Sequence, residues 1–494
     1  MPKKVLPLIF LLLACRLTAS ANFSFDNNCL DIYKTIFSLK LNDARQQIQR
    51  QKQLTPQNGV LVLLENYVDY FSLLMSENRS DYDRWKDLES ERIDAIKSNE
   101  ENSPYYLYCQ AEIYLQWGLI KGRFGDYTSS AFDLKKANSL YKDNEEKYPG
   151  FIPDQKGMAI INVTFGSLPP SLKSISRFFG MRGDITSGVK QLEDLHAALP
   201  RSKYSYLQNE VIFALCNIDI DVLHHKNNYT KLKSYLTQMD SNATLLKTYL
   251  LGYIATKTAH NDDAITYLEA TPKSPQYASL PLIYYMLGNA KLNRMDADAP
   301  ESLNRYLKEY KGANYIKDTY LKLAYYYLLN NDHTRFESYI KLVRTKGSNS
   351  DEKDQQALRE ANDTQPDTNV LLARLFYDGG YNDRALAQLK NVDVDELKTL
   401  RDKIEYFYRL GRLYERTNRI NDALGYYQRT INIGKDTHYY YAAQSAMIIA
   451  ELYEQQKDFS RAANFYHQAL DMRNHEYQNS IDTECKEGLK RIGK

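Results

Sequence analysis

The 494-residue sequence contains little glycine and proline, with 21 and 14 residues, and this scarcity disfavours a turn-rich all-β fold. Tryptophan occurs twice and cysteine five times. Four of the cysteines, Cys29, Cys109, Cys216 and Cys485, are scattered, without a CxxC spacing or nearby histidines. They therefore form no metal pattern and no dense disulfide framework, and we expect buried thiols. A single long-range disulfide remains an alternative.

An excess of charge of one sign is also missing. The 64 basic and 62 acidic residues leave a net charge of +2, which gives no electrostatic footprint for nucleic acid. What the chain does contain is 43% hydrophobic and 26% charged residues, a composition typical of globular proteins, and 42 tyrosines. So many amphipathic rings suit an elongated protein with a large, half-buried surface.

The N-terminus resembles a secretion signal. Lys3 and Lys4 precede an apolar stretch from Val5 to Ala14, and Ala19-Ser20-Ala21 is a small-residue cleavage site. In a competing interpretation, Leu12-Leu13-Ala14-Cys15 is a bacterial lipobox, and Cys15 is lipidated and becomes the mature N-terminus. Both interpretations predict export to the periplasm or the outer membrane. No other apolar run reaches the roughly 18 residues of a membrane span, so the mature chain is expected to have no transmembrane segment.

A repeat begins near residue 245. A Leu or Ile followed by a small residue recurs at steps of 36, 36, 49, 38 and 39 residues, in the pairs Leu251-Gly252, Leu287-Gly288, Leu323-Ala324, Leu372-Ala373, Leu410-Gly411 and Ile449-Ala450. Thirteen residues after the first member stands another set, Ala264, Phe336, Ala385, Ala423 and Ala462, and bulky residues follow four positions later. The unit with Pro300 departs from this spacing. A large and then a small residue lets a partner helix approach closely, so the period predicts stacked helix pairs.

These positions resemble the tetratricopeptide repeat (TPR). The matching residues include Leu410, Gly411, Tyr414, Ala423 and Tyr427, and again Ile449, Ala450, Tyr453, Ala462 and Tyr466. The resemblance covers roughly residues 245–478 and implies an all-α fold, a right-handed superhelical solenoid of TPR-like helix pairs. Within the longest step, residues 345–368 are polar, and we expect a surface insertion with a short helix around Glu352–Glu360.

Helical patterning continues upstream without a clear register. The expected helices are Cys29–Leu39, Asn42–Lys52, Val60–Met75, Asp81–Lys97, Pro104–Lys121 and Tyr127–Glu146. The expected domains are a signal peptide (1–21), degenerate helical repeats (22–146), a connecting segment interrupted by Pro and Gly (147–200), TPR-like repeats (201–478) and a C-terminal tail (479–494).

The connecting segment has its own pattern. We expect a helix, a turn at Pro169-Pro170, a short helix, a sharp turn at Gly180 and a helix capped by Asp184. The string around Leu168, Phe179, Gly183 and Gly188 is similar to the central stretch of the eukaryotic tetratricopeptide repeat protein 39 family, which implies a shared helical architecture. The export signal combined with Tyr-rich repeats looks like a bacterial envelope protein of the Bacteroidetes kind. The apolar stretch 157–179 is interpreted as a packing element, with a membrane-surface helix as the alternative.

Catalytic and metal-binding motifs are not found. The sequence has no Gly-x-Ser-x-Gly elbow and no P-loop, and Ser338 and Lys341 form a Ser-x-x-Lys without companion motifs. His224 and His225 are adjacent, so on a helix they point about 100° apart and do not readily share an ion. We therefore expect no enzyme activity, no metal and no cofactor.

The inner wall of such a solenoid is formed by the first helix of each pair, two residues before and after the Leu or Ile. The predicted groove residues at and near these positions are Tyr249, Tyr253, Tyr285, Asn289, Tyr325, Arg374, Tyr377, Tyr408 and Arg412. Tyr and Arg are enriched at binding hot spots, so these side chains are candidates for holding a protein partner. The alternative is that they only cover the wall of the solenoid itself.

The predicted function is an exported protein–protein interaction scaffold of the cell envelope. The second hypothesis is a glycan or small-ligand receptor tethered to the outer membrane, resembling the lipidated starch-binding-type helical proteins of similar size. Those proteins carry large inserts rich in Gly and Trp, whereas this chain has two Trp.

Overall fold

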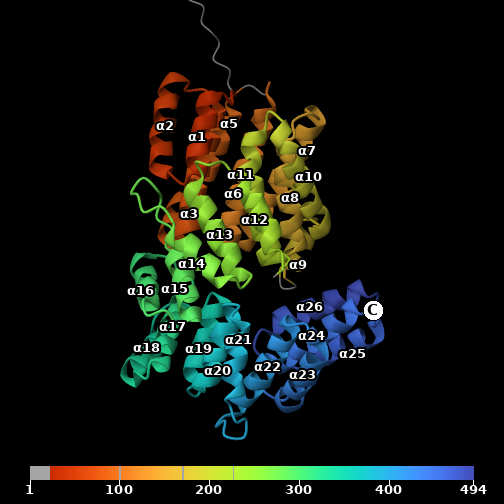
Figure 1. Ribbon diagram of the computed structural model, residues 1–494. Helices are drawn as coiled ribbons and strands as arrows, with labels where there is room; N and C mark the ends of the chain where they lie inside the picture. Colours follow the sequence, from red (N-terminus) through yellow and green to blue (C-terminus); the bar gives the residue numbers. More distant parts are fainter. Residues whose placement is uncertain (1–22, 100–101, 170–171, 226) are drawn as a thin grey trace, which may run out of the picture.

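The computed structural model describes residues 23–99, 102–169, 172–225 and 227–494, and no strand occurs among them (Figure 1). Most of these residues are helical, and successive helices pack against each other. The predicted all-α solenoid is thereby confirmed. The expected signal peptide, its cleavage site and Cys15 lie outside the described residues. None of the described helices is long and apolar enough to cross a bilayer.

The first part of the chain is built from helices of unequal length. They are α1 (Asn27–Phe37), α2 (Leu41–Leu54), α3 (Gly59–Ser76), α4 (Arg79–Trp85), α5 (Leu88–Lys97), α6 (Pro104–Arg123), α7 (Tyr127–Lys147), α8 (Pro153–Gly166), α9 (Lys173–Phe178), α10 (Ile185–Ala198), α11 (Gln208–Asn217) and α12 (Tyr229–Thr237), with short 3-10 turns η1 (Leu199–Arg201) and η2 (Ser205–Leu207) and a π-helical turn η3 (Ile218–Val222). The six helices expected upstream of residue 147 are found within a few residues, with one correction. The expected helix Asp81–Lys97 is two helices, α4 and α5, because the chain turns at Lys86 and Asp87.

The second part contains six helix pairs and two further helices. The pairs are α13 (Thr244–Lys257) with α14 (Asn261–Glu269), α15 (Leu282–Arg294) with α16 (Ala299–Glu309), α17 (Ile316–Leu329) with α18 (His333–Thr345), α20 (Thr368–Asp378) with α21 (Asn382–Lys390), α22 (Leu400–Arg416) with α23 (Ile420–Gly434), and α24 (Tyr441–Gln455) with α25 (Phe459–Asp471). They correspond to the six units of the sequence repeat. The inserted helix is α19 (Glu352–Asn362), and α26 (Gln478–Arg491) ends the chain.

The turn inside each pair has the same backbone geometry. Eight residues after the Leu or Ile of the large–small pair stands one residue with a left-handed backbone: Ala259, Met295, Asn331, Gly380, Asn418 or Lys457. A left-handed residue also follows α1, at Leu39, and α6, at Gly125. Most of these residues are not glycine, so the packing of the two helices must offset the cost of this conformation.

Close approach of the paired helices explains the small residues. A Cβ atom added at Gly411 would lie 2.7 Å from Tyr427 Cδ1, and one at Gly118 would lie 2.9 Å from Leu134. Trp117-Gly118 is followed by Ser130 at 13 residues and Leu134 at 17, the spacing of the later repeats. The pair α6 and α7 is therefore a helix pair of the same kind, which the sequence analysis did not place in register.

The connecting segment has the expected helices, while the expected turn at Pro169-Pro170 lies partly outside the described residues. It contains α8, the short α9 and α10, with Gly180 in a left-handed turn and the Asp184 side chain accepting a hydrogen bond from the Ser187 amide at 2.7 Å. A Cβ atom at Gly183 would meet the backbone nitrogen of Gly166 at 2.1 Å, so α8 and the start of α10 touch through their backbones. Because Gly157, Ala159 and Ile161 are buried, α8 is a packing element.

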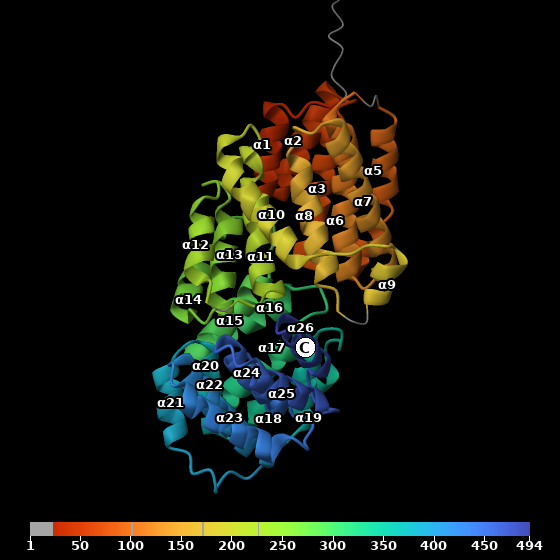
Figure 2. The same ribbon diagram turned by 90° about the vertical axis from the view of Figure 1, so that its right-hand side faces the viewer.

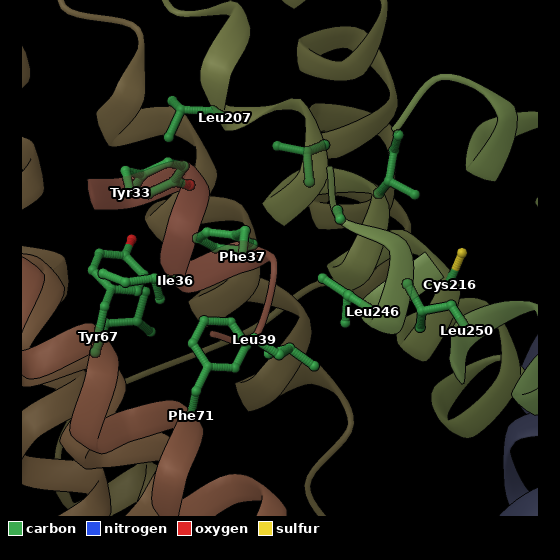
Figure 3. Packing of buried hydrophobic residues seen from close by; sticks show 14 of the residues in the cluster. Tyr33, Ile36, Phe37, Leu39, Tyr67, Phe71, Leu207, Cys216, Leu246 and Leu250 are labelled. Atoms are coloured by element: carbon green, nitrogen blue, oxygen red, sulfur yellow. The ribbon is translucent and has the colours of Figure 1, made fainter. Parts of the chain in front are cut away.

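The N-terminal helices pack against helices almost 200 residues later in the chain (Figure 3). Tyr33 and Phe37 of α1, with Phe71 of α3, lie in one hydrophobic cluster with Leu246 and Leu250 of α13. The core is continuous from Phe23 to Tyr310, while the later repeats have smaller clusters of their own. Long-range contacts therefore hold the first part of the molecule. In the second part most contacts join neighbouring helices, and a few, such as Asn261 Nδ2 to Tyr381 Oη at 3.0 Å, join distant units.

A charged lysine lies inside this core. Lys156 is fully buried, and its Nζ lies 2.8 Å from Glu112 Oε2 and 2.7 Å from Glu210 Oε1. Tyr67 and Tyr33 donate hydrogen bonds to the same carboxylates. Burial alone would lower the pKa of Lys156, but Glu112 and Glu210 more than offset it and raise that pKa above its usual value.

The end of the chain is helical and not an extended tail. In α26, Ile481 and Cys485 are buried, and Gly488 lies directly under the Tyr466 ring. This helix thus covers the last repeat, whose apolar face would otherwise be exposed. The four described cysteines are all free and buried, so no disulfide forms among them.

Candidate partner-binding surface

The predicted groove residues all lie on first helices of the repeats. Tyr253, Tyr285, Tyr325, Tyr377 and Tyr408 are 4–8% exposed, so they are buried. The other four are half-buried: Tyr249, Asn289, Arg374 and Arg412. We use the name inner wall for these nine residues together with the half-buried Glu451 of α24. The prediction that they bind a partner stays a prediction.

Three of the five buried tyrosines of the inner wall donate hydrogen bonds to acidic side chains of neighbouring segments. Tyr285 donates to Asp318 Oδ2 at 2.7 Å, Tyr253 donates to Asp221, and Tyr325 donates to Glu360. Burial first, and then the nearby carboxylate, raises the pKa of each of these phenols. A buried phenol needs an acceptor, so each of these bonds ties one unit to another.

Arg374 is the centre of an ionic network. Its Nε and Nη2 donate to the two carboxylate oxygens of Glu405 at 2.7 and 2.5 Å, and its Nη1 donates to Glu360 at 2.8 Å. Arg409 donates to Glu405 as well, at 3.0 Å. Burial would raise the pKa of Glu405, but Arg374 and Arg409 outweigh it and hold that pKa at about 2. The carboxylate is therefore charged at every physiological pH.

At the C-terminal end, the inner wall is aromatic and cationic. Arg412 Nε donates to Tyr377 Oη at 3.0 Å, and the Arg416 guanidinium lies 3.9 Å from the centre of the same ring. The ring of Tyr408 packs against Tyr441 at 5.2 Å. These contacts orient the arginines, because the planar guanidinium stacks on an aromatic face.

The inserted helix lies on the inner wall, which corrects one prediction. A helix at Glu352–Glu360 was expected and is present as α19 (Figures 1 and 2), but one face of it is buried against the repeats. Asp354, Ala357 and Ala361 are at most 1% exposed, and α19 packs against α17 and α18. A composition rich in Asp, Asn, Gln and Ser indicated a surface segment. Polar side chains of this segment instead form hydrogen bonds with residues of the inner wall.

Contacts with several repeats hold α19. Lys353 Nζ lies 3.3 Å from Tyr285 Oη, and Asp354 Oδ1 accepts from the Asp318 amide at 3.0 Å. Glu360 bonds to Tyr325 and Arg374, as described above. At the end of the helix, Tyr439 donates to Asp363 at 2.9 Å, and Arg401 Nη1 lies 3.3 Å from the same carboxylate.

The apolar contribution to this docking is small, because the fully buried apolar residues of α19 are alanines. The inner wall of this protein therefore holds a helix mainly through charged and hydrogen-bonded contacts. This property was not readable from the repeat spacing, since the wall residues and their partners on α19 belong to different units.

Seven residues of the inner wall lie outside the α19 contacts described above, and four of these seven are half-buried. Tyr249 packs parallel to Tyr253, with ring centres 6.0 Å apart, and Asn289 Oδ1 has no hydrogen-bond partner among the described residues. At the other end are Arg412 and Glu451. Burial, followed by Glu484 and Glu415, raises the pKa of Glu451 to about 7. These half-buried polar groups form the accessible part of the wall.

The other motifs considered in the sequence form no catalytic or metal-binding arrangement among the described residues. Ser338 Oγ donates to the Thr334 carbonyl at 2.9 Å within α18, an ordinary helix contact. Among the described residues, no group of three or more His, Cys, Asp or Glu side chains is arranged to hold a metal ion.

Comparisons with known proteins agree with the repeat assignment. Residues 447–476, in α24 and α25, match the tetratricopeptide repeat family. No curated protein matches the chain.

Several solved structures are similar in outline. The Cut9–Hcn1 hetero-tetramer of the APC/C is 12% identical, with 95% of this chain and 97% of that chain covered and a TM-score of 0.25. Yeast Tom70 is 13% identical, with 93% and 96% covered and a TM-score of 0.28. The human IFIT1 dimer with PPP-AAAA is 12% identical, with 91% and 95% covered and a TM-score of 0.30. At these scores the chains do not superpose as wholes, so the function is inferred below from the contacts of this chain.

Proposed function

We propose that this protein is an exported scaffold that binds a helical segment of a partner protein along the inner wall of its repeats. The observation that carries the proposal is the docking of α19. Tyr325 and Arg374 of the wall and the neighbouring Arg401 hold this polar segment, which supports a polar helix as the partner segment. Recognition of a helix in a groove is a recurrent mode of peptide binding.

The chemistry of α19 indicates the chemistry of the partner. The helix presents Ala357 and Ala361 toward the wall, one turn apart, with carboxylates on either side. Small residues let the two helices approach, and carboxylates match the phenol and guanidinium donors. The expected partner segment is therefore an acidic helix with small residues at i and i+4. It docks on the accessible part of the inner wall, near Tyr249 at one end and Arg412 at the other.

Export is part of the proposal and rests on the sequence. The charged start, the apolar stretch and the small-residue site of residues 1–21 support a signal peptide, and Cys15 supports a lipid tether as the alternative. The periplasm or the outer membrane of a Bacteroidetes-like bacterium is the proposed location. The likeness of residues 168–188 to the tetratricopeptide repeat protein 39 family supports shared architecture, since Gly183 is needed where α8 meets α10.

Site-specific photo-crosslinking tests the scaffold. Benzoylphenylalanine replaces Tyr249 in one full-length protein and Glu451 in another, and both are irradiated in the native envelope. The matched control carries it at Glu337, an exposed residue of the second helix α18. We expect the same protein adduct from both wall positions and not from the control. Equal adducts at all three positions, or none at the wall in folded protein, would refute the proposal.

The site of membrane attachment is tested separately. A Cys15→Ser variant is compared with the natural protein by fractionation and by labelling with a fatty-acid probe. Lipidation predicts loss of the label and release from the membrane fraction, while cleavage after Ala21 predicts no label in either protein.

A further inference from the structure

A cavity lies away from the inner wall, between α1 and the segment that joins α10 to α13. Its volume is about 390 Å³, and its lining is Tyr33, Lys34, Pro200, Ser205, Tyr206, Gln208, Asn209, Gln238 and Asp240. A volume near the lower end of the roughly 300–1,000 Å³ of ligand pockets suits a ligand of one or two rings. None of these residues belongs to the repeat pattern.

The floor of the cavity is buried and firmly held. Tyr33, Gln208 and Asn209 are 2%, 9% and 6% exposed. Tyr33 Oη donates to Glu210 Oε2 at 2.8 Å, and through Glu210 it is joined to the buried Lys156. Asn209 Oδ1 accepts from the Asp240 amide at 2.9 Å. Held in this way, the floor residues are already positioned for a ligand, which reduces the entropic cost of binding.

One polar atom of the floor lacks a partner. Gln208 donates through Nε2, which lies 2.8 Å from His196 Nδ1 and 3.5 Å from Gln238 Oε1. Its Oε1 is buried and accepts no hydrogen bond from the described residues. A buried amide oxygen without a donor costs free energy, and a hydroxyl group in the cavity would satisfy it.

The lining selects among classes of ligand. Lys34 and Asp240 bring one charge of each sign, so together they favour neither a positive nor a negative net charge on the ligand. The floor is neutral, and burying an ion there without a partner would be unfavourable. Gln208 and Asp240 need donors and Lys34 needs acceptors, and hydroxyl groups supply both. The rings of Tyr33 and Tyr206 offer apolar surface for the face of a sugar ring.

We propose that this cavity is a binding site for a small neutral saccharide of one or two rings. The site is independent of the protein-binding wall, and its ligand is recognised by the amides of Gln208 and Asn209, the carboxylate of Asp240 and the neighbouring tyrosine rings. It gives the chain a second binding function, separate from the scaffold.

The test measures binding of monosaccharides and disaccharides to the full-length protein by calorimetry, with free amino acids and dipeptides as a second panel. Gln208→Met removes the unpartnered oxygen at similar volume, and Gln191→Met, at an exposed site on α10, is the matched control. Ser205→Phe, at the exposed mouth, fills the cavity without touching the core. Melting curves check that every variant is folded.

Binding of a saccharide at micromolar to millimolar concentration is expected. Gln208→Met should weaken it by about tenfold or more, which corresponds to the loss of a hydrogen bond to a buried group. Ser205→Phe should abolish binding, and Gln191→Met should leave it unchanged. The proposal is overturned by an absence of saccharide binding, by binding that Ser205→Phe does not change, or by binding of amino acids or dipeptides alone.

Discussion

Arg374 of α20 and Glu405 of α22 form a two-point ion pair between neighbouring repeats, with donor–acceptor distances of 2.7 and 2.5 Å. Glu405 is 1% exposed, and Arg409 is its second cationic partner. This pair joins two units that are also linked by the hydrogen bond from Arg412 Nε to Tyr377 Oη. The stability of the inner wall therefore depends on the carboxylate of Glu405.

Replacing Glu405 should therefore be costly. Glu405→Ala leaves Arg374 and Arg409 without their shared partner in a buried site, and we expect a loss of about 3–5 kcal/mol in the free energy of unfolding. Urea denaturation followed by circular dichroism measures it. Glu337→Ala, at an exposed position of α18, is expected to change stability by less than about 0.5 kcal/mol. Equal stability of the two variants would show that the ion pair does not join the repeats.

The repeat register is tested by shortening core leucines. Leu323 is fully buried and Leu410 is 5% exposed, so Leu323→Ala or Leu410→Ala should each destabilise the protein by about 2–5 kcal/mol. Leu400 lies on the same helix as Leu410 but is 51% exposed, which makes Leu400→Ala the matched control. If thermal melting of both core variants stays at the wild-type temperature, the register is wrong.

Two glycines should respond to alanine with opposite signs. At Gly183 a Cβ atom would lie 2.1 Å from a backbone nitrogen, so Gly183→Ala must separate α8 from α10 and should cost about 1–3 kcal/mol. At Gly425, inside α23, nothing lies within 4 Å of the added Cβ. Gly425→Ala should stabilise the protein by up to about 1 kcal/mol through helix propensity. Chemical denaturation of both variants gives the two signs, and a shared sign would contradict the packing of α8 on α10.

Glu451 should make stability depend on pH near neutrality. Its pKa is raised to about 7 in the folded chain, so the folded state holds a proton that the unfolded state releases at its ordinary, lower pKa. The stabilisation is fully present below the unfolded pKa and is lost as pH rises through about 7.

The Glu451→Gln variant stays neutral at every pH. Between about pH 5 and about pH 8, its melting temperature should therefore fall less than that of the natural protein. The slope will not vanish, because Glu476 also has a pKa raised to about 7 by burial. Glu337→Gln serves as the control and should keep the wild-type slope. An unchanged slope in Glu451→Gln would show that this carboxyl does not titrate in that range.

Local patterns predicted most of the fold. The large–small pairs predicted six helix pairs from residue 244 onward, five of them supported by the residue that follows at 13 positions, and Asp184 and Gly180 predicted the start of α10 and the turn before it. The helices α6 and α7 were predicted, but their repeat register was missed because Trp117 and Ser130 replace the usual Leu and Ala. Met295 and Lys457 adopt the left-handed backbone conformation that favours glycine. Their residue types do not predict this conformation.

The inner wall was predicted only in part. The spacing correctly assigned Tyr285, Tyr325 and Arg374 to first helices, because that position depends on local periodicity alone. It could not assign their partners, Asp318, Glu360 and Glu405, since the pairing depends on how units stack. The position of α19 depends on contacts with segments from Tyr285 to Tyr439, and no local pattern carries that information.

The buried Lys156 implies that the core around it folds only after a later part of the chain has been synthesised. Its two carboxylate partners lie before and after it in the chain, and Glu210 is synthesised 54 residues later. Until then the lysine lacks its second charge partner, and the apolar surfaces of α1 and α3 stay uncovered until α13 has been synthesised as well. We expect the N-terminal half to need protection from aggregation during synthesis, while each later repeat folds soon after it is made, onto the one before it.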